Sequence, residues 1–306
     1  MMTLLAMSIM ASPNYVISGH IKYNLNKSAK TAKVTGFTEE LSFGKAKIKE
    51  SVSQDGVSYK VTAIDSEAFW GSFLEGVTIP NTVKTIGTRA FKNCNLKKLE
   101  LPNSITIIGA YAFEEAIDKG IDLVIPKNVT IIRQHAFTLC NLKSVTFQGK
   151  KLEEIGDYAF SGNNIVNITI PAVDDLGEGV MCGNKKLQTA VVKGNVQILK
   201  DQFFNGCVSL KSVTLPATIT EVGLYCFHNC ASLTSFPKMP NLEIIGESAF
   251  AECEGLVTLH DLPESLRFIK KEAFNSCDNL TEVTIPANVG TISEYCFDYC
   301  KRSTRL

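Results

Sequence analysis

A single internal repeat governs what this chain can fold into. The unit I-x-x-x-A-F, or a close variant of it, recurs along most of the sequence, and each copy ends in an anchor residue. Successive anchors are 21 to 24 residues apart, with a mean of 22.8. A fixed period of this kind is typical of solenoids, in which a repeat buries its apolar residues only by stacking on its neighbours. The anchors are Phe69, Phe91, Phe113, Phe137, Phe160, Met181, Phe204, Phe227, Phe250, Phe274 and Phe297.

A second element lies between the anchors: a short β-branched run closed by proline. Examples are residues 77–80 (VTIP), 123–126 (LVIP) and 168–171 (ITIP). Proline has no N–H to donate to a ladder, so it is suited to the end of a strand. Stacked repeats would align these strands in parallel, about 4.8 Å apart, in one continuous sheet. The sequence therefore predicts a β-rich leucine-rich-repeat solenoid of about eleven repeats of about 23 residues, with parallel strands stacked along one face.

The outward-facing positions of these strands form one row along the predicted solenoid. Side chains alternate between the faces of a strand, so the residue between two buried β-branched positions points to solvent. Solenoids commonly bind ligands across such a face. Threonine also suits an exposed strand without any partner, which explains much of the same pattern. The candidate ligand-binding residues are Thr78, Glu100, Val124, Thr146, Thr169, Val191, Thr214, His260 and Thr284.

Seven of the ten cysteines stand three residues after an anchor. A small residue repeated once per turn indicates a packing position, whereas a zinc site needs clustered ligands. We therefore predict reduced structural thiols, with no disulfide and no metal site. The glycines that follow the repeated isoleucine, such as Gly87 and Gly156, are interpreted as residues of a tight turn. The seven cysteines are Cys94, Cys140, Cys207, Cys230, Cys253, Cys277 and Cys300.

The sequence contains no recognisable catalytic or cofactor motif. The four histidines are scattered, and His135 and His228, which flank anchors, are expected to be exposed turn residues. Phosphate-loop, nucleophile-elbow, zinc-protease and dinucleotide-binding patterns are missing from the sequence. The 31 basic residues balance 31 acidic ones, which removes the basic footprint that nucleic-acid binding needs. We expect no enzyme activity, no cofactor and no nucleic-acid partner.

The repeat resembles that of the BspA-like leucine-rich-repeat surface proteins, which reads roughly L-x-x-V-x-I-P-x-x-V-x-x-I-G-x-x-A-F-x-x-C. The match extends from about Val61 to Cys300. Residues 21–37 and 52–64 also look like the β-rich segment that precedes the repeats in that family. The resemblance implies an extracellular or cell-surface protein of bacteria or mucosal protists that acts in adhesion. Its partner would be a protein or glycan on a host or neighbouring cell.

Three regions follow from this reading. Residues 1–19 are a signal or tail, residues 20–60 an N-terminal β cap that covers the first apolar layer, and residues 61–306 the solenoid. Residues 4–11 (LLAMSIMA) resemble the core of a secretory signal, although no basic residue precedes them. The chain stops soon after the last anchor, at residues 301–306, so we expect the solenoid to be C-terminally incomplete.

Two further expectations concern the solenoid and the membrane. Residues 172–183 (AVDDLGEGVMCG) lack the anchor phenylalanine and gain glycines, which predicts a local distortion of the solenoid. No apolar run is long enough to span a bilayer, so we expect no membrane insertion of the mature chain.

The leading interpretation is a non-enzymatic cell-surface or secreted recognition or adhesion module that binds a protein or glycan across the exposed strands. The alternative is an intracellular repeat scaffold for protein–protein interaction, which the unpaired thiols and the lack of a basic segment before residue 4 favour. A third interpretation is an accessory domain of an enzyme whose chemistry lies on other sequence. The sequence leaves all three open, and it does not identify a ligand.

Overall fold

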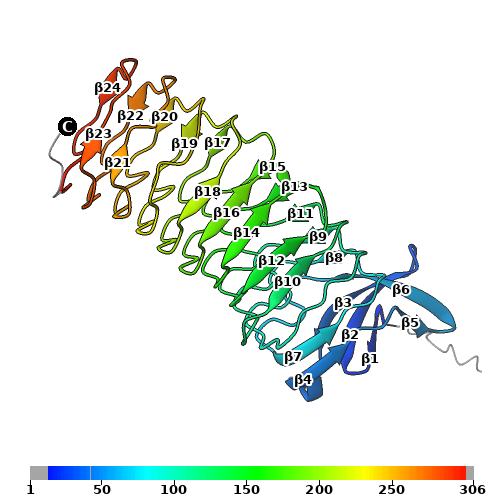
Figure 1. Cartoon of the computed structure of the whole chain (residues 1–306). Helices are drawn as coiled ribbons and strands as arrows, with labels where there is room; N and C mark the ends of the chain where they lie inside the picture. Colours follow the sequence, from blue (N-terminus) through cyan, green and yellow to red (C-terminus); the bar gives the residue numbers. More distant parts are fainter. Residues whose placement is uncertain (1–12, 42, 301–306) are drawn as a thin grey trace, which may run out of the picture.

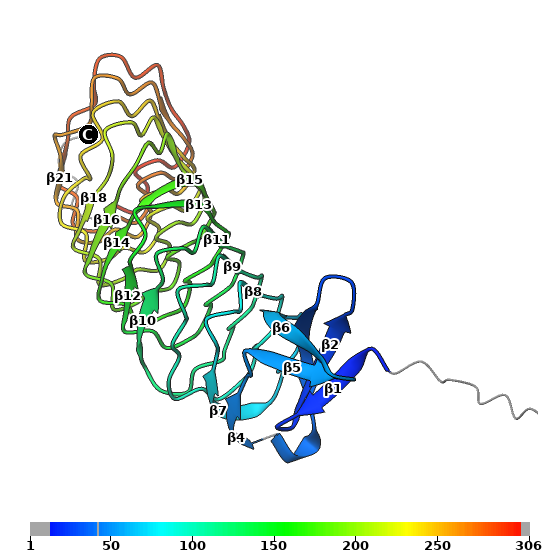
Figure 2. The same ribbon diagram turned by 90° about the vertical axis from the view of Figure 1, so that its right-hand side faces the viewer.

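The computed structural model describes residues 13–41 and 43–300. The chain forms an elongated solenoid that runs from a group of N-terminal strands to the last anchor, Phe297 (Figures 1 and 2). Residues 4–11, predicted to resemble a signal, and residues 301–306 lie outside the described residues. The predicted leucine-rich-repeat solenoid is confirmed.

The N-terminal strands pair mostly antiparallel and continue into the repeats. They are β1 (Tyr15–Ser18), β2 (Ile21–Asn26), β3 (Thr31–Phe37), the 3-10 turn η1 (Glu39–Leu41), β4 (Phe43–Lys47), β5 (Ser51–Gln54) and β6 (Val57–Ile64). β6 pairs with β3 and β5, and then with the first strand of the repeats. The ring of Phe37 stacks 5.9 Å from the ring of the first anchor, Phe69. The capping role of residues 20–60 and the boundaries of the three regions stay predictions.

One side of the solenoid is a row of short parallel strands, each ending at the apolar residue five positions before an anchor. This isoleucine row consists of β8 (Thr85–Ile86), β9 (Ile107–Ile108), β11 (Ile131–Ile132), β13 (Lys151–Ile155), β15 (Ala172–Leu176), β17 (Ile198–Leu199), β19 (Glu221–Val222), β20 (Ile244–Ile245), β22 (Phe268–Ile269) and β24 (Thr291–Ile292). The row is split, because one sheet ends at β15 and the next begins at β17. The distortion predicted near residues 172–183 is therefore confirmed as an interrupted ladder, which an ion pair of 2.9 Å between Lys200 and Asp175 bridges.

A second side, the strand face, holds the strands that were predicted to carry the binding residues. It consists of β7 (Phe73–Thr78), β10 (Asp122–Ile125), β12 (Ser144–Phe147), β14 (Asn167–Ile170), β16 (Thr189–Val192), β18 (Ser212–Thr214), β21 (Thr258–Leu259) and β23 (Glu282–Val283). Pairing is parallel between neighbouring repeats, but it holds only within the groups β4–β7, β10–β12, β14–β16–β18 and β21–β23. The predicted continuous sheet is therefore wrong. At residues 234–240 (TSFPKMP), Pro237 and Pro240 have no N–H with which to continue a ladder.

The third side consists of the anchor turns, the segments around each anchor. In every repeat, the residues two before and two after the anchor have left-handed φ values between 49° and 71°. This pair is Tyr111 and Glu115 at the anchor Phe113, for example, and His135 and Leu139 at Phe137. The N–H groups of the anchor and of these two residues each donate to a carbonyl of the next repeat, at every step from Phe69 to Phe297. The anchor turns therefore form the one backbone ladder that is unbroken across all the repeats in the described part of the chain.

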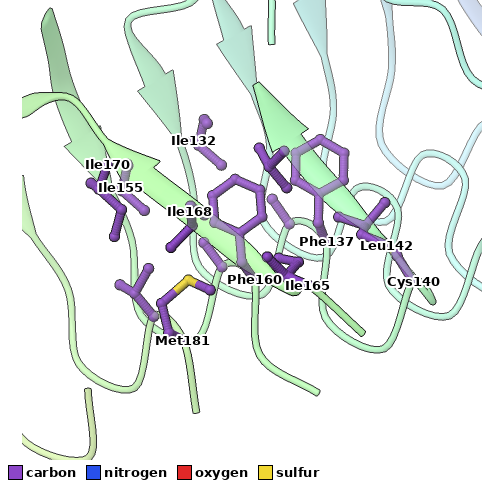
Figure 3. Close-up of a cluster of buried hydrophobic side chains, with 14 of the residues drawn as sticks. Ile132, Phe137, Cys140, Leu142, Ile155, Phe160, Ile165, Ile168, Ile170 and Met181 are labelled. Atoms are coloured by element: carbon purple, nitrogen blue, oxygen red, sulfur yellow. The ribbon is translucent and has the colours of Figure 1, made fainter. Parts of the chain in front are cut away.

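The anchors stack along the axis of the solenoid. The rings of Phe91 and Phe113 lie 5.1 Å apart and nearly parallel, and the stack continues at similar spacing to Phe160. Figure 3 shows Phe137 and Phe160 side by side, with Met181 next in line. Met181 is fully buried and fills the place of a ring, and the stack resumes from Phe204. One continuous apolar core therefore runs the length of the repeats, as stacking requires.

In nine of the ten repeats that follow another anchor, the side chain three positions after the anchor donates a hydrogen bond to the anchor carbonyl of the preceding repeat; Ala116 is the exception. The Sγ atom of Cys230 lies 3.3 Å from the carbonyl oxygen of Phe204, and the other six cysteines of this set make the same contact. Asn163 and Asn184 occupy this position in two repeats, and their Nδ2 atoms lie 2.9 Å from the equivalent carbonyls. The carbonyl of Phe204 also accepts the N–H of Cys207 over 3.0 Å, so the thiol is a second donor to this carbonyl. The repeated cysteines are therefore donors as well as packing residues.

The glycines after the repeated isoleucine have a different role from the one expected. Gly87 does not adopt a left-handed φ; instead, a Cβ atom there would lie 2.5 Å from the backbone nitrogen of Ser66 and 2.6 Å from the carbonyl carbon of Asp65. Gly246 is equally close to the backbone of Gly223. These glycines do open a turn, since the carbonyl of Gly87 accepts the N–H of Ala90 over 3.3 Å. The turn is not the reason for glycine, however: adjacent repeats approach too closely there for a side chain.

Candidate functional site

The structure places the candidate binding residues along the strand face. Eight of the nine side chains are exposed, and Val191 is half-buried. Pairing aligns Val124 with Thr146, and Thr169 with Val191 and Thr214. At the far end, the Nδ1 atom of His260 lies 2.9 Å from the Oγ1 atom of Thr284. The interruptions of the ladder divide this row into groups rather than bringing all nine residues into one site.

Four of the five threonine hydroxyls of the outward row have no partner among the described residues; the fifth, that of Thr284, is hydrogen-bonded to His260. Among the described residues, the side chains of Thr78, Thr146, Thr169 and Thr214 accept or donate no hydrogen bond within the protein. The row two residues earlier differs, because the Ser144 hydroxyl donates to Asp122 over 2.6 Å and the Thr189 hydroxyl donates to Asn167 over 2.6 Å. Hydrogen bonds between neighbouring strands therefore explain the polar residues Ser144 and Thr189 of the earlier row. They do not explain why threonine stands at the four outward positions.

Shallow hollows open on the strand face where strand pairing lapses. Five of them have volumes from about 280 to about 610 Å³. The largest lies between β12 and β14, and two others flank residues 234–240. An interrupted ladder leaves space between neighbouring strands. The interruptions of the sheet therefore also produce the hollows on this face.

Charges on the strand face are mostly neutralised locally. Lys97 pairs with Glu75 over 2.5 Å, and Lys98 pairs with Glu100 over 2.6 Å. The second ring nitrogen of His260 lies 3.3 Å from a carboxylate oxygen of Glu282. Glu100 and His260 are therefore tied to neighbours, which distinguishes them from the unpartnered threonines of the same row.

The cysteines form neither a disulfide nor a ligand set. All ten are free thiols, and burial raises the pKa of Cys140 and of Cys253 to about 12. A thiol with so high a pKa stays protonated at neutral pH, which lets it donate a hydrogen bond and makes it a poor nucleophile. Across residues 13–41 and 43–300, no three His, Cys, Asp or Glu side chains are grouped so that they could hold a metal ion.

The anchor turns carry an aromatic stack that the sequence did not lead us to expect. His135 is half-buried, with its ring 4.8 Å from that of Tyr111 and 5.2 Å from that of Tyr158, and all three are nearly parallel. Burial lowers the pKa of His135. The expectation of an exposed turn residue is therefore wrong for His135. His228 is also half-buried, 3.3 Å from the Oδ1 atom of Asn205. The signal for the stack was an aromatic residue two positions before the anchor in three successive repeats.

The described residues contain no helix long and apolar enough to cross a membrane. The stacked repeats, the anchor-turn ladder and the exposed strand face define the class of the protein as a leucine-rich-repeat solenoid. The family model of the BspA-type leucine-rich repeat region, which contains 6 copies of the repeat, matches residues 62–174, 116–234 and 175–304. The chain therefore belongs to the BspA-type leucine-rich-repeat family.

Solved structures with the same fold come from several bacteria. A leucine-rich cell-surface protein of Faecalibacterium prausnitzii A2-165 is 23% identical, with a TM-score of 0.53, over 96% of this chain and 94% of that one. The pneumococcal vaccine antigen PcpA is 19% identical, with a TM-score of 0.63, over 94% of this chain and 85% of that one. At these identities the likeness supports the fold alone. The comparison with curated proteins found no match.

Proposed function

We propose that this chain is a non-enzymatic recognition or adhesion module that holds a protein or glycan across the strand face. The observation that carries the proposal is the row of exposed threonine hydroxyls that have no protein partner, set among shallow hollows. Exposed donors and acceptors that recur along several repeats suit an extended ligand that contacts more than one of them.

The proposed location is the cell surface or the extracellular medium. Membership of the BspA-type family supports it, as does the likeness to a solved protein described as a leucine-rich cell surface protein. In the sequence analysis, the unpaired thiols favoured the alternative of an intracellular scaffold. Because most of them are buried and act as donors to backbone carbonyls, their reduced state has a structural reason that does not depend on a reducing compartment.

The proposed function is tested by changing the strand face without touching the core. The variant Thr169→Glu with Thr214→Glu adds charge and bulk at two exposed, unpartnered positions, and Gln134→Glu with Gln197→Glu adds the same charge on the other two sides. We screen the wild-type chain against an array of glycans and secreted proteins and measure both variants on whatever it binds. The strand-face variant should bind about tenfold more weakly or worse, which corresponds to roughly 1.4 kcal/mol, and the control should bind normally.

The thermal unfolding midpoint is the control for folding, since exposed substitutions usually change stability by no more than about 0.5 kcal/mol. Equal binding by the wild type and the strand-face variant, or equal losses in both variants, would show that the strand face is not the binding surface.

A further inference from the structure

The largest hollow on the strand face lies between two groups of strands. It has a volume of about 610 Å³ and opens between β12 and β14, where the parallel ladder is interrupted. Its volume falls within the range of sites that hold a small ligand or one residue of a polymer. The residues that line this hollow are Val145, Thr146, Phe147, Gln148, Gly149, Lys150, Thr169, Pro171 and Lys193.

The lining is made by two departures from the repeat. Most strands of this face are closed by proline, but Gln148 and Lys193 stand in that place after β12 and β16. Each has an N–H group, and these donate to the carbonyls of Ile125 over 3.0 Å and Ile170 over 3.1 Å. β14 lies between them and keeps its proline, Pro171. With Gln148 and Lys193 in place of proline, a polar and a cationic side chain line the hollow.

Among the five hollows, this one has the most positive lining. Its nine lining residues include two lysines and no carboxylate. The hollow beside Thr214 has one lysine, Lys238, and no carboxylate, and the other three include carboxylates. Within the described part of the chain, neither Lys150 nor Lys193 takes part in an ion pair, whereas Lys97 and Lys98 near the neighbouring hollows are each paired with a glutamate. Two ammonium groups without a counter-charge, beside a low-dielectric wall, make a locally positive potential that attracts an anionic group.

The remaining lining narrows the chemistry of the ligand. The Thr146 and Thr169 hydroxyls have no protein partner, and the Gln148 amide offers a further donor and acceptor. Below them, Val145 and Pro171 are buried and Phe147 is half-buried, so the hollow has an apolar wall. A sugar residue that carries a carboxylate or sulfate presents the matching set: one anionic group, several hydroxyls and an apolar C–H face.

We propose that this hollow binds one acidic sugar residue of an anionic polysaccharide, with Lys150 and Lys193 contacting the anionic group and the threonine row contacting the chain beyond it. The proposal rests on the proposed function, because it names the ligand class for one part of the strand face. Charge-assisted hydrogen bonds from the two ammonium groups would supply the discrimination against neutral glycans.

The test measures the binding of size-defined chondroitin sulfate and oligogalacturonate by titration calorimetry, with neutral dextran oligosaccharides and poly-glutamate as comparison probes. The test variant is Lys150→Gln with Lys193→Gln. Its matched control is Lys84→Gln with Lys185→Gln, which removes the same charge from exposed positions outside the hollow. We expect at least one acidic oligosaccharide to bind the wild type, the test variant to bind it about tenfold more weakly or worse, and the control to bind it nearly normally.

Salt supplies a second readout. Raising the salt to about 0.5 M should weaken wild-type binding strongly and that of the test variant only slightly, because exposed charges are screened. An unchanged affinity in the test variant, or equal losses in both variants, would remove the hollow as the site. Lysine-dependent binding of poly-glutamate that is as tight as that of the oligosaccharides would assign the hollow to acidic peptides and overturn the proposal.

The two proposals fail separately. If no acidic oligosaccharide binds but the array ligands still depend on Thr169 and Thr214, the ligand class is wrong and the recognition function stands. If the strand-face variant binds every array ligand normally, the recognition function itself fails, whatever the lysine variants do.

Discussion

At the scale of single residues, the position three after each anchor decides how a buried carbonyl is satisfied. The thiol of Cys230 is fully buried and points at the carbonyl of Phe204, and in other repeats the amides of Asn163 and Asn184 make the same contact. Two side chains of different chemistry fill one role, so the position favours a small donor rather than sulfur itself, and buried Ala116 shows that one repeat does without a donor.

Removing this donor should destabilise the protein measurably. Cys230→Ala leaves the carbonyl of Phe204 with the N–H of Cys207 as its remaining donor and opens a small void, so we expect the free energy of unfolding to fall by about 1–2 kcal/mol. Cys230→Asn keeps a donor and should retain most of the stability. Chemical denaturation of both variants measures this free energy. A loss in Cys230→Asn as large as that in Cys230→Ala would show that the hydrogen bond to the Phe204 carbonyl does not account for the stability that Cys230 contributes.

At the scale of elements, the anchor turns hold the repeats in register more completely than either row of strands does. The strand rows are interrupted, whereas the three hydrogen bonds at each anchor step continue throughout. This side needs two left-handed residues in every repeat, and most repeats place an ordinary residue such as Tyr111, His135 or Glu252 in at least one of these positions. Left-handed conformations of such residues cost about 1 kcal/mol or more each, so the hydrogen bonds between repeats must hold them in place.

Glycines at two kinds of position should respond differently to substitution. Gly87→Ala puts a Cβ atom against the backbone of Ser66 and Asp65, so we expect a loss of about 1–3 kcal/mol or more in the free energy of unfolding. Gly206 has a left-handed φ of 71°, and the nearest atom to a Cβ there would be 3.7 Å away. Since Asn93 and Asn229 occupy the equivalent position, Gly206→Asn should cost less than about 1 kcal/mol. Equal losses would contradict the distinction between close approach and left-handed backbone.

The sequence was sufficient for the repeat, the core and the outward row, because stacked apolar residues and alternating strands leave a direct periodic signature. Phe113 and Phe137 are buried and Thr146 and Thr169 are exposed, as the period predicts. The left-handed anchor turns left only a partial signature: glycine or asparagine stands two residues after the anchor in six of the eleven repeats, whereas residues such as His135, two before the anchor, carry no such mark. The interruptions of the strand face were also missed, because the strand pattern around Thr146 and Thr169 looks regular on both sides of the gap.

At the scale of the whole molecule, the solenoid carries one core and three sides with different duties. The anchor turns join every repeat and the core supplies apolar burial, whereas the strand face is paired only in groups and turns its outward side chains to solvent. A molecule built in this way can present a long surface without exposing the groups that stabilise it. This division of duties suits the proposed recognition module.

The location is checked with protease on intact cells of the source organism, with a cytosolic protein as the control. We expect the repeats to be degraded while the cytosolic marker survives, because an exposed surface module is reachable without lysis. Protection of the repeats until lysis, with fractionation placing them in the cytosol, would contradict the proposed location and favour the intracellular scaffold.

The interrupted strand face also bears on how such a protein could change what it recognises. The closing position of a strand, proline in most repeats and Gln148 or Lys193 in two, lies outside the phenylalanine stack and the anchor-turn ladder. Exchanging the residue there alters whether a neighbouring gap is apolar or charged while the inherited core stays as it is. The residues proposed to set the ligand class and the residues that form the phenylalanine stack thus stand at separate positions of the same repeat.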